Sequence, residues 1–284
     1  MYSKFIIKEW KKHIFNILIN YMKKILVTGG TGLVGSHLLY QLVQSGNSPI
    51  AIHRHSSDIM NVKKIFSYYS KQSEKLFNQI SWFECDILDV LLLDNIVRKA
   101  THIYHCAALI SFNSELKNDM LDINTTGTAN IIDLSLKHGI KRICYVSSIA
   151  TLGSNHQSAL NEDCFWEWKN KSSYAISKYL AELEVWRGFA EGLSGFIVNP
   201  SLIIGPGSWS SGIGTIINRV NWGLPFYPPG KCGVIDASDL SKIMIQLMNS
   251  CINNERFIIN ADHISYKKLM SIISKNLNKK EPFI

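Results

Sequence analysis

The sequence predicts an α/β protein, a doubly wound parallel β-sheet with a smaller lobe at its C-terminal side. Three observations support this prediction. Short apolar runs rich in branched residues alternate with helical patterns from residue 22 to about residue 207, as expected of buried parallel strands joined by helices. The first run, Ile25–Val27, leads into closely spaced glycines and then into a helical pattern. Several later strands end in small or polar residues, which is where open α/β sheets bind their ligands.

The glycines after the first strand, Gly29, Gly32 and Gly35, follow a Gly-x-x-Gly-x-x-Gly spacing. Glycine lets the backbone turn tightly and approach a pyrophosphate, and the helix that follows offers free N–H groups and the positive end of its dipole to that anion. From Leu33 onward, apolar residues recur every three or four positions. A plain strand-to-helix turn is the simpler alternative, but the order strand, turn and helix favours the dinucleotide fingerprint of a Rossmann fold.

Length and composition indicate a globular protein of one large domain, alone or with a small lobe. The chain has 284 residues, of which 46% are hydrophobic and 18% charged, which are ordinary globular values. We expect an N-terminal extension at 1–21, a dinucleotide-binding Rossmann domain at 22–207, and at 208–284 mainly a substrate-binding lobe with elements that return to the sheet. The start of that lobe mixes aromatic residues with Gly and Pro and does not alternate strand and helix; helix 238–249, strand 256–260 and helix 265–277 follow.

The net charge of +8 does not indicate a nucleic-acid protein. Residues 1–24 hold six lysines and one glutamate, a net of +5, so the other 260 residues carry +3. No basic stripe with interleaved aromatic residues occurs in them. Residues 1–21 could form a basic amphipathic helix on a membrane surface, but we favour an upstream extension before a start at Met22. Charged residues interrupt every apolar run there, so we expect neither a signal peptide nor a spanning helix.

The cysteines and histidines indicate neither disulfides nor a metal. The six cysteines are scattered without a Cys-x-x-Cys pair, so we expect reduced thiols and a cytoplasmic protein. His102, His105 and Cys106 lie close together, but on a strand that we expect to be buried, so we expect no metal site.

The end of the second strand indicates the preferred cofactor. An NAD enzyme places an acidic residue about twenty residues beyond the glycines to bind the ribose 2′-hydroxyl. Here strand 49–53 ends in His53 and Arg54, with Ser56 and Ser57 nearby, and Asp58 comes several residues later. A cation with hydroxyl neighbours suits a 2′-phosphate, so NADP(H) is favoured over NAD(H). A solvated loop arginine remains the alternative.

The next two strand ends supply further cofactor candidates. Asp86 follows strand 80–84 and could accept a hydrogen bond from the adenine amino group, or it could cap helix 90–99. Strand 102–106 is followed by Ala107 and Ala108, whose small side chains let the backbone lie against a cofactor.

Three later residues indicate the chemistry. Strand 141–147 ends at Ser148, and a helix that begins near residue 173 carries Tyr174 and Lys178, which are four apart and therefore share one face. Reduction of a carbonyl needs a proton for the oxygen, and a free tyrosine, with a pKa of about 10, gives one poorly. A nearby ammonium favours the phenolate and lowers that pKa. Lys178 could also bond the nicotinamide ribose, and Ser148 could hold the substrate oxygen.

Together these stretches resemble the extended short-chain dehydrogenases/reductases, the NAD(P)-dependent epimerase/dehydratase superfamily. The matches, spread over residues 22 to about 277, are Thr28-Gly-Gly-Thr-Gly-Leu-Val-Gly35, Asp86-Ile-Leu-Asp89, His105-Cys-Ala-Ala108, Asn124 with Gly127-Thr-Ala-Asn130, Tyr145-Val-Ser-Ser148, Tyr174-Ala-Ile-Ser-Lys178 and Asn199-Pro-Ser-Leu-Ile-Ile-Gly-Pro-Gly207. The resemblance implies that Tyr174 is the acid/base, that Lys178 is its partner and that Ser148 polarises the substrate. The residues expected to bind the cofactor are Gly29, Thr31, Gly32, Leu33, Val34, Gly35, Arg54, Asp86, Ile87, Ala107, Ala108, Asn124, Tyr174, Lys178, Pro200 and Ser201.

Within that superfamily the sequence is most similar to the dihydroflavonol-4-reductase-like group, because of Arg54 and the Asn199–Gly207 stretch. Sugar-nucleotide dehydratases carry an Asp-Glu pair directly after the catalytic hydroxyl residue, where this chain has Ile149 and Ala150. Family members are often some tens of residues longer, so part of the substrate lobe is expected to be missing. The expected function is NADPH-dependent reduction of a ketone or aldehyde.

Two other functions remain open. One is an epimerase that uses tightly held NAD to oxidise and re-reduce a sugar-like substrate. The other is a dinucleotide sensor without catalysis, against which the intact Ser148, Tyr174 and Lys178 argue. The resemblance also suggests a homodimer that pairs through helices 116–138 and 173–188.

Overall fold

The computed structural model describes residues 23–283 except for residues 112, 154–159 and 210–211. The expectations for residues 1–21 lie outside this part of the chain. Among the described helices, none is long and apolar enough to cross a bilayer.

A seven-stranded parallel sheet forms the larger part of the molecule, in the order β3-β2-β1-β4-β5-β6-β9. This is the Rossmann-like α/β fold that the sequence predicts. The order reverses between β1 and β4, and a ligand site is expected at the carboxyl ends of the strands at such a point. The strands are β1 Ile25–Thr28, β2 Ile50–His53, β3 Ser81–Glu84, β4 His102–His105, β5 Arg142–Val146, β6 Gly195–Pro200 and β9 Glu255–Ile259.

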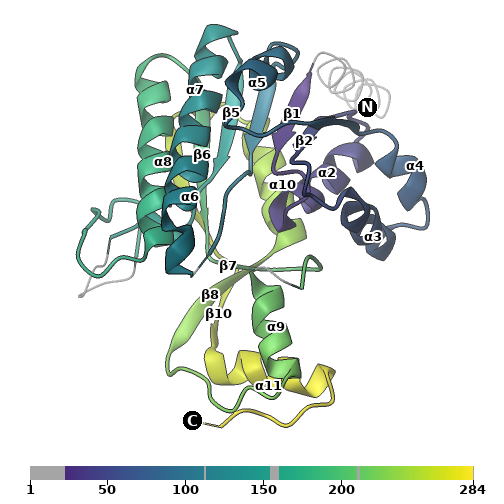
Figure 1. The fold of residues 1–284 in the computed structure, drawn as a ribbon, viewed down its shortest axis with the longest axis vertical. Coiled ribbons are helices and arrows are strands. Elements are labelled where there is room, and N and C mark those ends of the chain that lie inside the picture. Colours follow the sequence, from purple (N-terminus) through teal and green to yellow (C-terminus); the bar gives the residue numbers. More distant parts are fainter. Residues whose placement is uncertain (1–22, 112, 154–159, 210–211, 284) are drawn as a thin grey trace, which may run out of the picture.

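Helices cover both faces of this sheet (Figure 1). On one face lie α2 (Leu33–Gln44), α3 (Ile59–Tyr69), α4 (Ser73–Phe77) and α10 (Ala237–Met248); on the other lie α5 (Val90–Val97), α7 (Gly127–Lys137) and α8 (Ser173–Ala190). Neighbouring strand residues point to opposite faces of the sheet. Tyr104 therefore packs on the face that carries α2 and α10, and Ile103 on the face that carries α7 and α8. For the same reason, Cys144 of β5 packs on the face of Tyr104, and Tyr145 packs on the face of Ile103.

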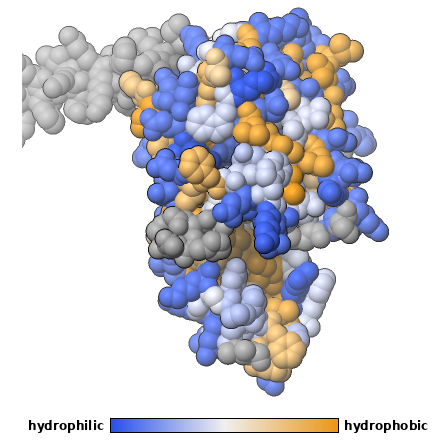
Figure 2. All heavy atoms as spheres, turned by 90° about the vertical axis from the view of Figure 1, so that its left-hand side faces the viewer, coloured by the Kyte–Doolittle hydropathy of each residue, from blue (hydrophilic) through white to orange (hydrophobic). Residues whose placement is uncertain are grey.

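A three-stranded sheet forms the smaller lobe at the bottom of Figure 1. Its order is β10-β8-β7, with β7 and β8 parallel and β10 antiparallel. The elements are β7 Leu202–Ile204, β8 Lys231–Asp236, β10 Asp262–Ser265, α9 Ile213–Asn221 and α11 Tyr266–Asn276. Figure 2 shows a largely hydrophilic face with separate apolar patches, one of them where the larger part narrows to this lobe. The expectation that strand and helix do not alternate at the start of the lobe was wrong, because α9 and β8 lie there.

The segment predicted as one helix over 116–138 is divided. A single 3₁₀ turn at Ser114–Leu116 leads into α6 (Lys117–Leu121), a π-helical turn (Asp122–Thr126) and then α7. The widened turn contains Asn124, whose bonds are described below. The other helices and strands expected from the sequence agree with the structure to within a few residues at their ends.

Candidate functional site

The turn after β1 brings its backbone against the end of β4. Gly29 has a φ of +65°, and a Cβ at this position would lie 2.7 Å from the backbone N and Cα of Ala107. A Cβ on Gly35, in the first turn of α2, would lie 2.2 Å from the carbonyl oxygen of Gly29. Both positions therefore require glycine, because the neighbouring atoms belong to the backbone and cannot move aside cheaply.

The N-terminus of α2 has the form of an anion site. Its N-cap is Gly32, and no side chain caps it, so the first N–H groups of the helix remain available to a ligand. Leu33 packs toward the 205–207 segment, since a Cβ on Gly207 would meet Leu33 Cδ1 at 3.0 Å. Val34 packs against the core. Their side chains are thus used in packing, and neither residue lines the cavity described next.

A cavity of about 160 Å³ opens beside this turn and is lined by residues from the ends of four strands. It brings together eight of the predicted cofactor residues: Gly29, Thr31, Gly32, Arg54, Asp86, Ile87, Ala107 and Ala108. The close backbone approaches and the uncapped helix fit a dinucleotide pyrophosphate. Pro200 and Ser201 do not line this cavity; they end β6 and follow it, and the Ser201 backbone N–H donates to the Ile259 carbonyl (3.1 Å).

Arg54 extends from the end of β2 into solvent and makes no ion pair with any described residue. The loop around it is fixed by Ser57, whose Oγ accepts a hydrogen bond from the Arg54 backbone N–H (3.2 Å). An acidic group that the sequence did not indicate lies close by, because Glu84 at the end of β3 pairs with His55 (3.1 Å).

Asp86 closes a turn after β3 by accepting a hydrogen bond from the Leu88 backbone N–H (2.9 Å). It does not cap the next helix. Asp89 does, accepting from Leu92 N–H (3.0 Å), so the alternative role considered for Asp86 was wrong. Ile87 is held from α7, since the Asn130 amide donates to its carbonyl (2.9 Å) and Gly127 leaves room for its side chain.

Asn124 joins three parts of the chain behind the cavity. Its side chain accepts from Leu109 N–H (2.7 Å), donates to the Leu109 carbonyl (2.9 Å) and donates to Ser177 Oγ of α8 (3.0 Å). These bonds hold the helical segment around Asn124 against the loop that contains Leu109. The widened π-helical turn, Asp122–Thr126, lies at the same place. Asn124 therefore positions the loop after β4 and does not line the cavity itself.

Ser148 and Tyr174 come together where β5 ends and α8 begins. Ser148 caps a short 3₁₀ turn (Ile149–Thr151), and its Oγ accepts from Ala150 N–H (3.1 Å). Burial raises the pKa of Tyr174, and a hydrogen bond with Ser148 partly offsets this effect. The sequence predicted a lowered pKa, so that prediction was wrong.

Lys178 is fully buried beside them, with 1% of its surface exposed. Its Nζ donates to Tyr145 Oη (2.6 Å) and to the Val146 carbonyl (2.9 Å). Burial lowers the pKa of Lys178 to about 7, while Glu182 and Cys106 act to raise it. A lysine that is only partly charged at neutral pH exerts a weaker field on Tyr174, which agrees with the raised pKa of the tyrosine.

Glu182 continues the face of α8 that carries Tyr174 and Lys178, four residues further on. It is 2% exposed, and its carboxylate accepts from Ser147 Oγ (2.5 Å), Thr151 Oγ1 (2.8 Å) and the Asn199 amide (3.0 Å). These donors lie on either side of Ser148 in the chain or in β6, so Glu182 fixes the backbone around Ser148. Glu182 belongs to none of the sequence motifs, although its four-residue spacing from Lys178 could have indicated this role.

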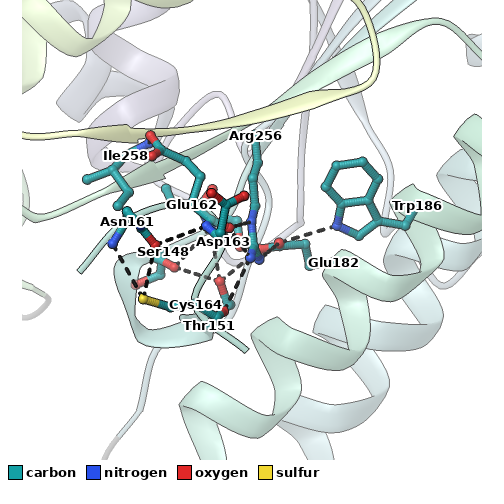
Figure 3. Close-up of polar contacts among 12 residues, drawn as sticks. Ser148, Thr151, Asn161, Glu162, Asp163, Cys164, Glu182, Trp186, Arg256 and Ile258 are labelled. Carbon is teal, nitrogen blue, oxygen red and sulfur yellow. Dashed lines mark hydrogen bonds and ion pairs between the residues drawn. The ribbon is translucent and has the colours of Figure 1, made fainter. Parts of the chain in front are cut away.

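Arg256 of β9 neutralises Glu182 from the edge of the sheet, with Nη1 3.0 Å from Glu182 Oε1 (Figure 3). Its Nε donates to the Glu162 carbonyl (2.8 Å), and the Glu162 carboxylate accepts from Ile258 N–H (2.8 Å). Arg256 thereby joins β9, α8 and the loop near residue 162. A larger cavity of about 400 Å³ is lined by these residues together with Trp166 and Trp186, away from the glycine turn.

His102, His105 and Cys106 do not form a metal site with one another. His105 is fully buried between Thr28 Oγ1 (2.7 Å from Nδ1) and Thr128 Oγ1 (3.0 Å from Nε2). Within the part of the chain that the structure describes, no group of three His, Cys, Asp or Glu residues could hold a metal ion. All six cysteines are free.

The fold and this site define a nucleotide-binding Rossmann protein of the oxidoreductase type. The NAD dependent epimerase/dehydratase family model matches residues 25–259. The chain belongs to this family of enzymes.

Among curated relatives, the chain is similar to "Sterol demethylase protein B" of Methylococcus capsulatus, with 24% identity over 250 residues, 86% of this chain and 72% of the relative. It is also similar to "Putative dihydroflavonol 4-reductase" of Synechocystis, with 28% identity over 258 residues, 87% and 71% of the two chains. Other relatives are UDP-glucose 4-epimerases and a UDP-N-acetyl-alpha-D-glucosaminuronate decarboxylase.

Solved structures share the fold. That of gox2253 has a TM-score of 0.80 at 24% identity and covers 92% of this chain and 77% of its own. The dTDP-glucose 4,6-dehydratase of Streptomyces venezuelae, solved with NAD bound, has a TM-score of 0.78 at 20% identity, covering 90% and 82%.

Proposed function

We propose that this protein is an NADPH-dependent reductase of a small ketone or aldehyde. The observation that carries the proposal is the meeting of Ser148, Tyr174 and buried Lys178 at the carboxyl edge of the sheet that also holds the glycine turn. A nicotinamide cofactor bound there supplies the hydride. The chain itself has to supply a proton and a means of holding the carbonyl oxygen.

Tyr174 is the proposed proton donor. The phenol is protonated at neutral pH, the form that gives a proton to a carbonyl oxygen as the alcohol forms, while its raised pKa opposes release of that proton and so calls for a group that stabilises the phenolate. Ser148, which bonds with Tyr174, would hold the same substrate oxygen. Lys178 would stabilise the phenolate that remains and bond the cofactor ribose.

The proposed cofactor contacts follow from the cavity. Its glycines would admit the pyrophosphate, Asp86 would accept from the adenine amino group, and Arg54 would bind a 2′-phosphate. Arg54 supports NADP over NAD, because it is an exposed cation that has no ion pair with a described residue at the end of β2. Asn124, Pro200 and Ser201 would hold the nicotinamide end indirectly, through the segments that they fix.

An NAD-dependent epimerase is the alternative that the relatives named above keep open. Such an enzyme first oxidises its substrate and needs the phenolate form of Tyr174, which burial disfavours.

A dehydratase is not favoured either. Ile149 and Ala150 follow Ser148, so the acid pair of the dehydratases has no counterpart here.

We also propose a cytoplasmic homodimer that pairs through α7 and α8. On α8, Leu183 exposes 43% of its surface, which suits a contact between two copies. Light scattering during gel filtration tests this, and a monomeric mass across the working concentrations contradicts it.

Paired titrations with NADPH and NADH test the cofactor proposal. We expect tighter binding of NADPH, and a loss of about tenfold or more in that affinity alone in Arg54→Ala, as for a charge-assisted phosphate contact. Arg98→Ala, an exposed arginine at the end of α5, is the matched control and should bind like the wild type. A preference of the wild type for NADH, or unchanged NADPH binding in Arg54→Ala, contradicts the proposal and favours the epimerase.

A further inference from the structure

Lys178 is held by a tyrosine that none of the roles above uses. Tyr145 lies in the middle of the sheet on β5 and is completely buried. Its Oη accepts a hydrogen bond from Lys178 Nζ (2.6 Å), and Nζ also lies 4.2 Å from the centre of its ring. The phenol ring and oxygen together therefore fix where the ammonium group can sit.

The contacts of Tyr145 lead from Lys178 to Thr128. The charged form of Lys178 can only donate, so Tyr145 Oη accepts from it, and a contact with the Thr128 hydroxyl acts to lower the pKa of Tyr145. Thr128 Oγ1 donates to the Asn124 carbonyl (2.6 Å) and therefore accepts from His105 Nε2.

His105 must then carry its proton on Nε2 and accept from Thr28 Oγ1 at Nδ1. Burial lowers the pKa of His105 to about 3, so that the imidazole is neutral, as this arrangement requires. Thr28 Oγ1 in turn accepts from the backbone N–H of Ala107 (3.2 Å), which lines the cofactor cavity. The chain of bonds thus runs from the wall of that cavity to Lys178.

Lys178 has one N–H left over. An ammonium group has three donors, and Tyr145 and the Val146 carbonyl take two of them, while no other described residue takes the third. We propose that Tyr145 is a positioning residue that directs this third N–H of Lys178 to the cofactor ribose. The inference rests on the proposed function and adds to it the residue that orients its lysine.

Other charged or titratable groups also face Lys178. Glu182 on α8 and Cys106 after β4 favour its charged form, while neutral His105 on β4 and protonated Tyr174 on α8 carry no charge against it. Removal of the Tyr145 oxygen leaves these groups in place and takes away one acceptor of the ammonium. Lys178 should then lose its proton at a lower pH.

The test is Tyr145→Phe, which keeps the ring and removes one atom. The matched control is Tyr104→Phe, a buried tyrosine on β4 in the core of the opposite face. In the wild type, we expect NADPH affinity to fall as the pH rises and Lys178 loses its charge. In Tyr145→Phe, the midpoint of this fall should move down by about one pH unit, and the affinity below both midpoints should also be lower than in the wild type, because the third N–H is no longer directed to the ribose. Tyr104→Phe should match the wild type throughout.

Three results would overturn the inference: an unchanged midpoint in Tyr145→Phe, wild-type affinity in Tyr145→Phe below both midpoints, or the same shift in Tyr104→Phe. If Tyr145→Phe does not fold, Thr128→Val removes the hydroxyl that contacts Tyr145 and should move the midpoint in the same direction, while Thr128→Ser should not. An unchanged midpoint in Thr128→Val then counts equally against the inference.

A cofactor-free measurement separates this inference from the proposed function. The Lys178 side-chain NMR signal, assigned by its loss in Lys178→Arg, should titrate near neutral pH in the wild type and lower in Tyr145→Phe. If the wild type does not bind NADPH, the proposed function fails, and this titration alone decides whether Tyr145 holds Lys178. Identical titrations in the two proteins refute the inference.

Discussion

Replacement of Arg256 by methionine tests the buried network that fixes the backbone of Ser148. Arg256 is the cation that faces the Glu182 carboxylate, which is 2% exposed. Methionine fills most of the same volume but carries no charge. In Arg256→Met, Glu182 would keep only neutral donors, chiefly Ser147, Thr151 and Asn199.

The cost can be worked from the burial of the two partners. Removal of one partner of a fully buried ion pair costs about 3–5 kcal/mol. The Arg256 side chain is 19% exposed, so in the variant water can solvate part of the Glu182 charge that Arg256 neutralises. We therefore expect a loss of about 2–4 kcal/mol in the free energy of unfolding. Urea unfolding followed by fluorescence of the seven tryptophans measures this directly.

Arg187→Met on the same helix is the matched control. Arg187 pairs with Asp133, Glu184 and Glu191, but its side chain is 35% exposed, and surface pairs of this kind contribute at most about 1 kcal/mol. The double variant Glu182→Gln/Arg256→Met should recover part of the loss, because the carboxylate that Arg256 neutralised is then also absent. Equal losses for the two arginine variants, or a loss under about 1 kcal/mol for Arg256→Met, would refute the reasoning.

Two further predictions concern the glycine turn and pH. Gly35→Ala places a methyl group 2.2 Å from the Gly29 carbonyl, so the turn must shift, and calorimetry should detect no NADPH binding; wild-type affinity would contradict the close approach. Burial holds the pKa of His105 at about 3 and that of His102 at about 4, below the ordinary value of 6.5. The unfolded chain therefore binds more protons, and the free energy of unfolding should fall as the pH falls from 6.5 toward 4. Urea titrations should show this slope, and a shallower one in His105→Asn; equal slopes would argue against a buried neutral imidazole.

Local patterns were sufficient to predict the parallel sheet and the meeting of Ser148, Tyr174 and Lys178. Strand ends share one edge of such a sheet, and residues four apart share one face of a helix, so neither inference needs long-range information. The same logic predicted the cavity residues near Gly29, since each follows a strand of the same sheet.

What the sequence did not indicate depends on contacts between distant segments. Arg256 reaches Glu182 across 74 positions of the chain, and β8 exists as a strand because β7 and β10 pair with it on either side. The interrupted helix near Asn124 likewise depends on a loop fifteen residues away. The bond between Lys178 and Tyr145 joins a helix to a strand, and no spacing within one element indicates it.

The most direct test of the central claim compares the turnover of wild type and Tyr174→Phe with NADPH and a panel of ketones and aldehydes. We expect the wild type to oxidise NADPH with at least one of them. We further expect that Tyr174→Phe still binds NADPH measurably, while its kcat at saturating NADPH falls by about a hundredfold or more, as for loss of a general acid. Turnover of Tyr174→Phe at the wild-type rate would contradict the claim that Tyr174 donates the proton.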